Sequence, residues 1–171
     1  MLELSVLKLL GLPVGSSEGY SLDGPVEIEG LIVKSELKGK CELMHIHEGV
    51  NVQFSNITIS LAFNCEKCLE QFSTEISIDT ASRQILLEAP ADTDDRNDIF
   101  LINSNDQTID LIEPLRQEII LHFPSIPVCS TSCKGICAFC GGEKNKKACN
   151  CKEIKVPENK PLSALKDLFK D

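Results

Sequence analysis

The 171-residue sequence contains no tryptophan, one tyrosine and two methionines, and it has no apolar run long enough to cross a bilayer. A spanning helix needs about 20 consecutive apolar residues, so the sequence excludes such a helix. The first 17 residues also lack a secretory signal, because Glu3 and Lys8 interrupt their apolar run and no basic segment or A-x-A cleavage pattern frames it. We therefore expect a cytoplasmic protein without membrane association.

Recognisable catalytic motifs are absent as well. The sequence shows no Ser/His/Asp triad, phosphate-binding loop, paired-carboxylate motif or internal repeat. His45 and His47 lie on the same face of one predicted strand and could bind a metal ion, but exposed strand positions are the commoner explanation. The acidic stretch 89–98 (APADTDDRND) lacks the glycine of a calcium-binding loop and is expected to be solvated. We predict neither an enzyme nor a small-molecule substrate.

Negative charge dominates the chain, with a formal net charge of −9, but it is unevenly distributed. Residues 1–128 hold 8 Lys and Arg against 21 Asp and Glu, whereas residues 129–160 hold 7 Lys against 3 Glu. A polyanion would therefore meet the C-terminal region, while the rest of the chain repels it or faces a protein. The candidate RNA contacts are Lys134, Lys144, Lys146, Lys147 and Lys152.

Strands are predicted over most of the first 110 residues. Period-2 alternation rich in Val, Ile and Phe indicates strands at 26–33, 41–47, 50–63 and 72–78, and segments 83–89 and 99–103 can add two more. Within 50–63, one face carries Ile57, Ile59, Leu61 and Phe63. The expected fold class is α+β, with a mostly antiparallel sheet or an open barrel.

Helical spacing replaces this alternation at Asp110. It predicts one helix at about 110–122, ended by Pro124, with Leu115 and Ile119 packed on the sheet so that the cysteine-rich module docks there. The segment PLSALKDLF (161–169) predicts a short C-terminal helix. We thus expect a β-rich body with its helix at 1–128, and a Cys-rich, lysine-rich module at 129–171 packed on the same domain.

Nine cysteines stand out against these absences, six of them between residues 129 and 151. An odd number cannot pair completely within one chain, which favours a reducing compartment. Two C-x-x-C turns, each able to direct two thiolates at one tetrahedral ion, are strong evidence for metal binding. We predict one or two zinc ions, with an open division of the ligands Cys65, Cys68, Cys129, Cys133, Cys137, Cys140, Cys149 and Cys151.

Three other interpretations apply to the same cysteines. A thioredoxin-type redox pair normally follows a strand of a βαβ unit, which this β-rich region lacks. An iron–sulfur cluster would need a ferredoxin-like spacing that is not present. A buried, inert role suits the remaining Cys41.

Taken together, three stretches of the sequence resemble the YceD family, the large ribosomal RNA subunit accumulation proteins. The stretches are CEKCLEQF (65–72), IDLIEPLRQEIILHFP (109–124) and the cysteine pattern from CSTSCKGICAFCG (129–141) to CNC (149–151), and the PLSALKDL ending is also similar. One departure is GEKNKK (142–147), where the family's cysteine-rich form usually continues differently.

The resemblance implies a non-enzymatic bacterial factor that supports 23S ribosomal RNA accumulation or processing and assembly of the large subunit. Its partner would be ribosomal RNA or a pre-ribosomal particle, with a ribosomal protein as a further partner. Because some relatives lack the cysteines, the zinc module would be structural reinforcement. An adaptor or chaperone for a basic ribosomal protein is the alternative, and a thiol redox enzyme is the third hypothesis.

Overall fold

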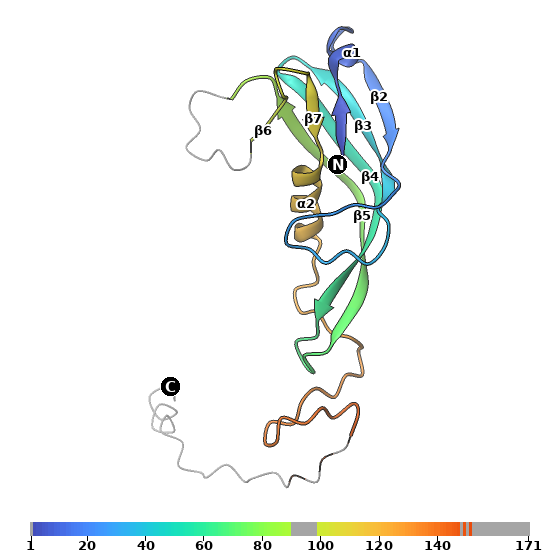
Figure 1. Ribbon diagram of the computed structural model, residues 1–171. Coiled ribbons are helices and arrows are strands. Elements are labelled where there is room, and N and C mark those ends of the chain that lie inside the picture. The colour runs from blue at the N-terminus through green and yellow to red at the C-terminus, as the bar shows by residue number, and fades with distance from the viewer. Residues whose placement is uncertain (1, 90–98, 148, 150, 152–171) are drawn as a thin grey trace, which may run out of the picture.

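The computed structural model describes residues 2–89, 99–147, 149 and 151, and its main feature is one twisted, open sheet (Figure 1). In spatial order the sheet consists of β2 (Ser17–Ser21), β3 (Lys38–Ile46), β4 (Gly49–Asn64), β5 (Gln71–Leu86) and β6 (Phe100–Leu101). Neighbours are antiparallel except for the parallel pair β5 and β6. The predicted α+β class is confirmed, with an antiparallel sheet rather than a closed barrel in the described part.

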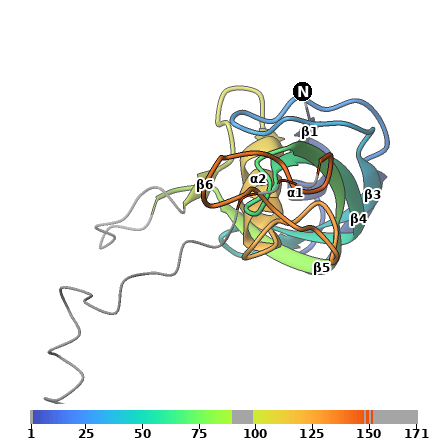
Figure 2. The same ribbon diagram turned by 90° about the horizontal axis from the view of Figure 1, so that it is seen from below.

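A smaller two-stranded sheet and two helices complete the architecture. The sheet pairs β1 (Glu3–Ser5) with β7 (Thr108–Asp110), and the helices are α1 (Leu7–Leu10) and α2 (Ile112–Leu121). Seen from below, β3, β4 and β5 curve around α2 (Figure 2). Neither described helix is long and apolar enough to cross a membrane. The β1, α1, β2 and β7 elements were not predicted from the sequence, because each is too short for its periodicity to be read.

The long hairpin of β4 and β5 forms the backbone of the fold. Both strands have 16 residues, and their register runs from the pair Gly49–Leu86 to the pair Asn64–Gln71. The hairpin extends past α2 and brings its turn to the cysteine-rich segment, which begins at Cys129 (Figure 1). The sequence predicted separate strands at 72–78 and 83–89. This is corrected, because residues 83–86 continue the same strand as 72–78.

Burial along β4 alternates, but the alternation changes phase in the middle of the strand. Val52 and Phe54 are buried before this point and Ile57 after it, and Asn56 lies between them with φ 51°. Asparagine tolerates this left-handed conformation better than most residues. Facing the irregularity, Gly39 has φ 153°, and a Cβ atom there would lie 3.0 Å from Ile57 Cα and 3.2 Å from Asn56 O, so the close approach of β3 favours glycine.

The predicted strand at 26–33 is wrong, because this segment is a loop that meets β4 only at the isolated bridge between Val33 and Leu61. Pro25 cannot donate a backbone hydrogen bond, and Gly30 turns the chain with φ 77°. The loop is instead tied to α2, where Arg116 Nε donates to the carbonyl oxygen of Glu29 at 2.9 Å. The alternating apolar residues of this loop pack on the main core, so the pattern reflects burial and not strand pairing.

The predicted helix corresponds to α2, and its apolar face enters the core. Leu111, Leu115 and Ile119 are fully buried, which confirms the expected packing of the last two. Asp110 Oδ1 accepts the backbone N–H of Ile112 at 2.9 Å, which satisfies one unpaired donor at the helix start. Glu113, in the first turn, pairs with Arg116. The predicted C-terminal helix at 161–169 lies outside the described residues, as does nearly all of the acidic stretch 89–98.

Candidate metal centres

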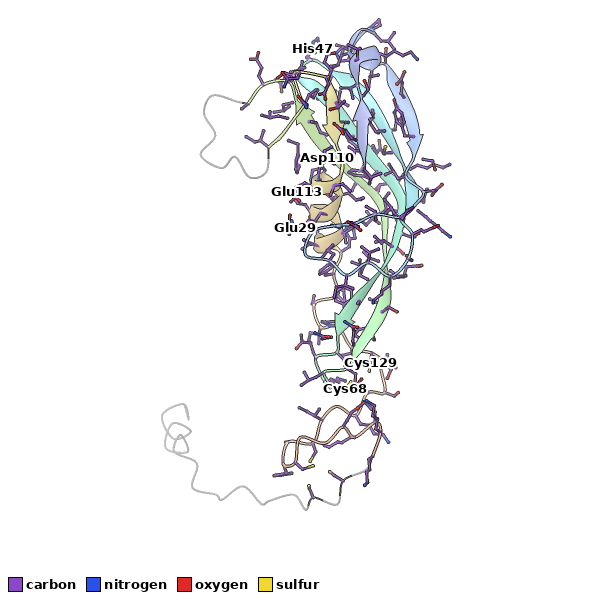
Figure 3. The ribbon with its side chains drawn as sticks, viewed as in Figure 1. Glu29, His47, Cys68, Asp110, Glu113 and Cys129 are labelled. Carbon is purple, nitrogen blue, oxygen red and sulfur yellow. The ribbon has the colours of Figure 1, made fainter. Side chains whose placement is uncertain are left out.

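The turn of the β4–β5 hairpin brings together four cysteines from two distant parts of the chain. Cys65, Cys68, Cys129 and Cys133 form what we call the first cluster, and their Sγ atoms all lie within 4.8 Å of one another. The Sγ atoms of Cys65 and Cys133 are 3.9 Å apart, and those of Cys68 and Cys129 are 3.7 Å apart (Figure 3 labels Cys68 and Cys129). A tetrahedral ion with Zn–S bonds of about 2.3 Å requires Sγ separations of about 3.8 Å. The first cluster therefore fits zinc.

Residues 65–70, which we call the first knuckle, have a turn geometry suited to holding an ion. Cys65 N–H donates to Glu70 O at 2.9 Å, and Leu69 N–H donates to Cys65 O at 2.8 Å. This double closure points Cys65 and Cys68 to the same side. It also forces Leu69 into a left-handed conformation with φ 64°, which is uncommon for a branched side chain.

The chain beyond α2 supplies the other two ligands of the first cluster by packing onto the first knuckle. Glu66 N–H donates to Pro127 O at 2.9 Å, and Ile136 N–H donates to Lys67 O at 3.0 Å. Between these contacts Gly135 has φ 69°, and a Cβ atom there would lie 2.8 Å from Lys67 O. Glycine thus permits both the turn and the close contact.

The acidities of these thiols show why the first cluster suits a cation. Burial would raise the pKa of Cys65, but backbone N–H groups of Cys129 and Cys68 directed at its sulfur lower that pKa to about 6. The amide of Asn145, whose Nδ2 lies 3.3 Å from Cys133 Sγ, lowers the pKa of Cys133. By contrast, the neighbouring Cys133 raises the pKa of Cys129 to about 12. Four sulfurs this close cannot all ionise without a positive charge between them, and a divalent ion supplies that charge.

A second cluster consists of Cys137, Cys140, Cys149 and Cys151, whose Sγ atoms also lie within 4.8 Å of one another. Backbone N–H groups of Cys140 and Phe139 lower the pKa of Cys137 to about 6, whereas Cys140 raises the pKa of Cys151 to about 12. The second cluster thus has the same donor set and the same electrostatic need as the first. The eight predicted ligands fall into two groups of four, which the sequence left open.

Residues 137–142, which we call the second knuckle, repeat the geometry of the first. Cys137 N–H donates to Gly142 O at 2.8 Å, and Gly141 N–H donates to Cys137 O at 2.9 Å, as in the first knuckle. Gly141 has φ 68° and occupies the position that Leu69 occupies in the first knuckle. Each knuckle belongs to a different cluster, so the two knuckles do not share one ion.

The sequence analysis did not identify Asn145, whose side chain links two parts of the cysteine-rich segment. Its Oδ1 accepts the backbone N–H of Lys134 at 2.9 Å, while its Nδ2 approaches Cys133 Sγ. The only sequence signal was its place in GEKNKK, the stretch that departs from the usual family pattern. Its amide therefore orders the polypeptide next to a candidate metal ligand.

The lysines of the segment differ in their surroundings. Lys146 Nζ pairs with Glu70 of the first knuckle and, at 2.7 Å, with Glu143, and both carboxylates raise its pKa. Within the described part of the chain Lys134, Lys144 and Lys147 form no ion pair, and Lys152 lies outside it. With one Zn²⁺ bound, four thiolates would leave two negative charges at each centre, and the lysines of the segment would help to offset them.

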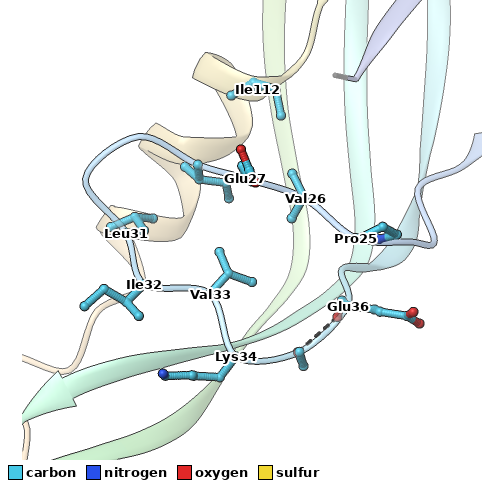
Figure 4. A pocket seen from close by; sticks show the side chains of 11 residues that line it. Pro25, Val26, Glu27, Leu31, Ile32, Val33, Lys34, Glu36 and Ile112 are labelled. Atoms are coloured by element: carbon cyan, nitrogen blue, oxygen red, sulfur yellow. Dashed lines mark hydrogen bonds between the residues drawn. The ribbon is translucent and has the colours of Figure 1, made fainter.

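The remaining candidates do not assemble into a site in the described structure. Cys41 is buried in the main core, away from both clusters. His45 Nδ1 lies 2.7 Å from Leu12 O, and neither His45 nor His47 belongs to a ligand group. An open groove of about 1080 Å³ lies beneath the loop 25–36, beside Ile112 of α2 (Figure 4). Its lining is mainly apolar, with no histidine or cysteine.

Comparison with protein families gives a match over most of the chain. The model of a family described as "Large ribosomal RNA subunit accumulation protein YceD" matches residues 55–169, more than half of the chain. This range contains most of the long hairpin, all of α2 and both clusters. Neither the curated proteins nor the solved structures contain a match.

Proposed function

Because this chain belongs to the YceD family, we propose that it is a non-catalytic, cytoplasmic factor that supports the accumulation of 23S ribosomal RNA. It would act on ribosomal RNA or on a pre-ribosomal particle during assembly of the large subunit. The observation that carries the proposal is the family match over residues 55–169, whose printed description names large-subunit ribosomal RNA accumulation.

Zinc is the ion proposed for both clusters, one ion in each. Thiolate ligands and tetrahedral spacing favour zinc, which needs no redox partner and commonly holds short loops in place. The ion in the first cluster would fasten the segment after α2 to the hairpin turn. The ion in the second cluster would hold the second knuckle, which has few apolar contacts of its own.

Contact with RNA is proposed for the unpaired lysines of the cysteine-rich segment. Lys134, Lys144 and Lys147 are exposed and form no ion pair in the described structure. Lysine ammonium groups bind phosphates as point charges and release counterions, so the interaction should weaken as salt is added. Lys146 has its charge engaged by Glu70 and Glu143 and would contribute mainly to the fold of the segment.

An adaptor for a basic ribosomal protein is the second candidate function. It is supported by the acidic body, since residues 1–128 hold 21 acidic against 8 basic side chains. Such a surface attracts cationic partners and repels RNA. Binding to a basic ribosomal protein, with no affinity for RNA at low salt, would favour the adaptor.

The test is a strain that lacks the gene and is grown both warm and cold. We expect mature 23S RNA to fall relative to the small-subunit RNA, with precursor particles visible on sucrose gradients. Complementation with the native gene should restore the ratio, and expression of an unrelated zinc protein should not. A normal RNA ratio at both temperatures would contradict the proposal.

A further inference from the structure

Phe139, in the middle of the second knuckle, is the one described aromatic residue that takes no part in a hydrophobic cluster. Its side chain is 50% exposed. The other described aromatic residues all belong to the two hydrophobic clusters, namely Tyr20, Phe54, Phe63, Phe72, Phe100 and Phe123. Packing therefore accounts for every described aromatic ring except that of Phe139.

Backbone hydrogen bonds hold the turn that carries Phe139. Cys137 and Cys140 flank it in the C-x-x-C turn, and both hydrogen bonds that close the second knuckle enclose it. The N–H of Phe139 is also directed at the sulfur of Cys137. Because the turn already fixes the backbone, binding to the exposed ring needs to order only the side chain, which favours a contact role.

Positive charge lies next to this ring along the chain. Ile136 and Glu143 form an isolated bridge, and Lys144 N–H donates to Gly135 O at 2.9 Å, so the strand-like pair leads directly into the second knuckle. In sequence, Lys134 precedes the bridge residue Ile136 and Lys144 follows the bridge residue Glu143. Neither lysine forms an ion pair in the described structure. An exposed ring on the same short segment as two unpaired lysines matches the chemistry of a nucleotide, which has a flat base and a charged phosphate.

We propose that Phe139 stacks on an unpaired RNA base while the neighbouring lysines hold the phosphates on either side. This inference rests on the proposed RNA-binding function and specifies it: the second knuckle recognises single-stranded segments. Bases in a duplex are stacked on each other and leave no open face, whereas exposed bases of single strands stack on aromatic side chains. No hydrogen-bond readout is involved, so the contact tolerates different base identities.

The experiment measures binding of zinc-loaded, full-length protein to a fluorescein-labelled single-stranded RNA of about 12 nucleotides and to a duplex of the same length. Phe139→Ala should weaken binding to the single strand about 5- to 100-fold. Phe139→Tyr should bind within about 2-fold of the native chain, because a stacking face remains. Leu121→Ala is the matched control, since Leu121 is an apolar residue on α2 with 70% exposure.

The salt dependence separates stacking from charge. Phe139→Ala should leave the log–log salt slope unchanged, whereas Lys144→Ala should reduce its magnitude by about one. Metal content equal to that of the native protein verifies that the second knuckle is intact. If the native chain binds RNA and Lys144→Ala flattens the slope, but Phe139→Ala binds like the native chain or weakens duplex binding equally, only the stacking inference fails. If the native chain binds no RNA even at low salt, the proposed RNA contact fails with it.

Discussion

The ring of Phe123, just beyond α2, packs edge to face against the ring of Phe63 near the end of β4, with centroids 4.9 Å apart and planes at 82°. Phe63 in turn lies 6.3 Å from Phe72 on β5, and Phe72 packs on the first cluster. This row of rings connects the helix with the cysteine-rich segment through direct contacts.

Replacing Phe123 by alanine should destabilise this connection. Loss of this partly buried ring and of its edge-to-face contact should lower the free energy of unfolding by about 2 kcal/mol, which urea unfolding can measure. Phe123→Leu is the control that keeps apolar volume without the ring geometry, and it should lose less stability. Equal stability of the alanine variant and the native chain would show that the row of rings does not support the fold.

Metal analysis should find two zinc ions in protein purified without chelator. Cys68→Ser should remove one ion and Cys140→Ser the other, because each substitution affects a different cluster. Cys41→Ser is the control and should keep both ions, since Cys41 lies in the main core. A well-folded native protein that carries one ion or fewer would contradict the prediction.

Gly135→Ala should loosen the first cluster. The added Cβ atom would lie 2.8 Å from Lys67 O, and alanine is disfavoured at φ 69°. We expect a loss of about 1–2 kcal/mol and faster release of zinc to a chromogenic chelator. Gly19→Ala is the matched control, because a Cβ atom there meets nothing within 4 Å and its φ is not positive.

Leu69→Gly should stabilise the first knuckle or leave its stability unchanged. The side chain is 65% exposed and its φ is 64°, so glycine relieves about 1 kcal/mol of strain at the cost of a more flexible unfolded chain. Leu69→Ala removes the same exposed side chain but keeps the strain, so the difference between the two variants isolates the backbone effect. Thermal unfolding would contradict this account if glycine were clearly less stable than alanine.

Lys146→Ala and Lys147→Ala should act differently although the residues are adjacent. Lys146 pairs with Glu70 and Glu143, so its loss should lower the unfolding temperature of the cysteine-rich segment. Lys147 forms no described ion pair, so its loss should affect the salt dependence of RNA binding instead. Identical behaviour of the two variants in both measurements would refute the division of roles.

The sequence by itself determined the candidate ligands and the main regular elements. C-x-x-C turns are local, so their geometry follows from a few residues, and eight candidate thiol ligands could be identified by spacing. The alternation in 50–63 and the helical spacing of Leu111, Leu115 and Ile119 likewise depend on local period, which long elements display clearly.

Tertiary structure alone decided how the eight cysteines divide and what the loop 26–33 becomes. Cys65 and Cys68 join Cys129 and Cys133 because 16-residue strands carry the hairpin turn past α2, a distance that no local pattern encodes. The loop has the alternation of a strand, but Pro25 and Gly30 limit its pairing while α2 and β4 bury its apolar side chains. Burial, not backbone pairing, produced that pattern, and only the packed chain distinguishes the two causes.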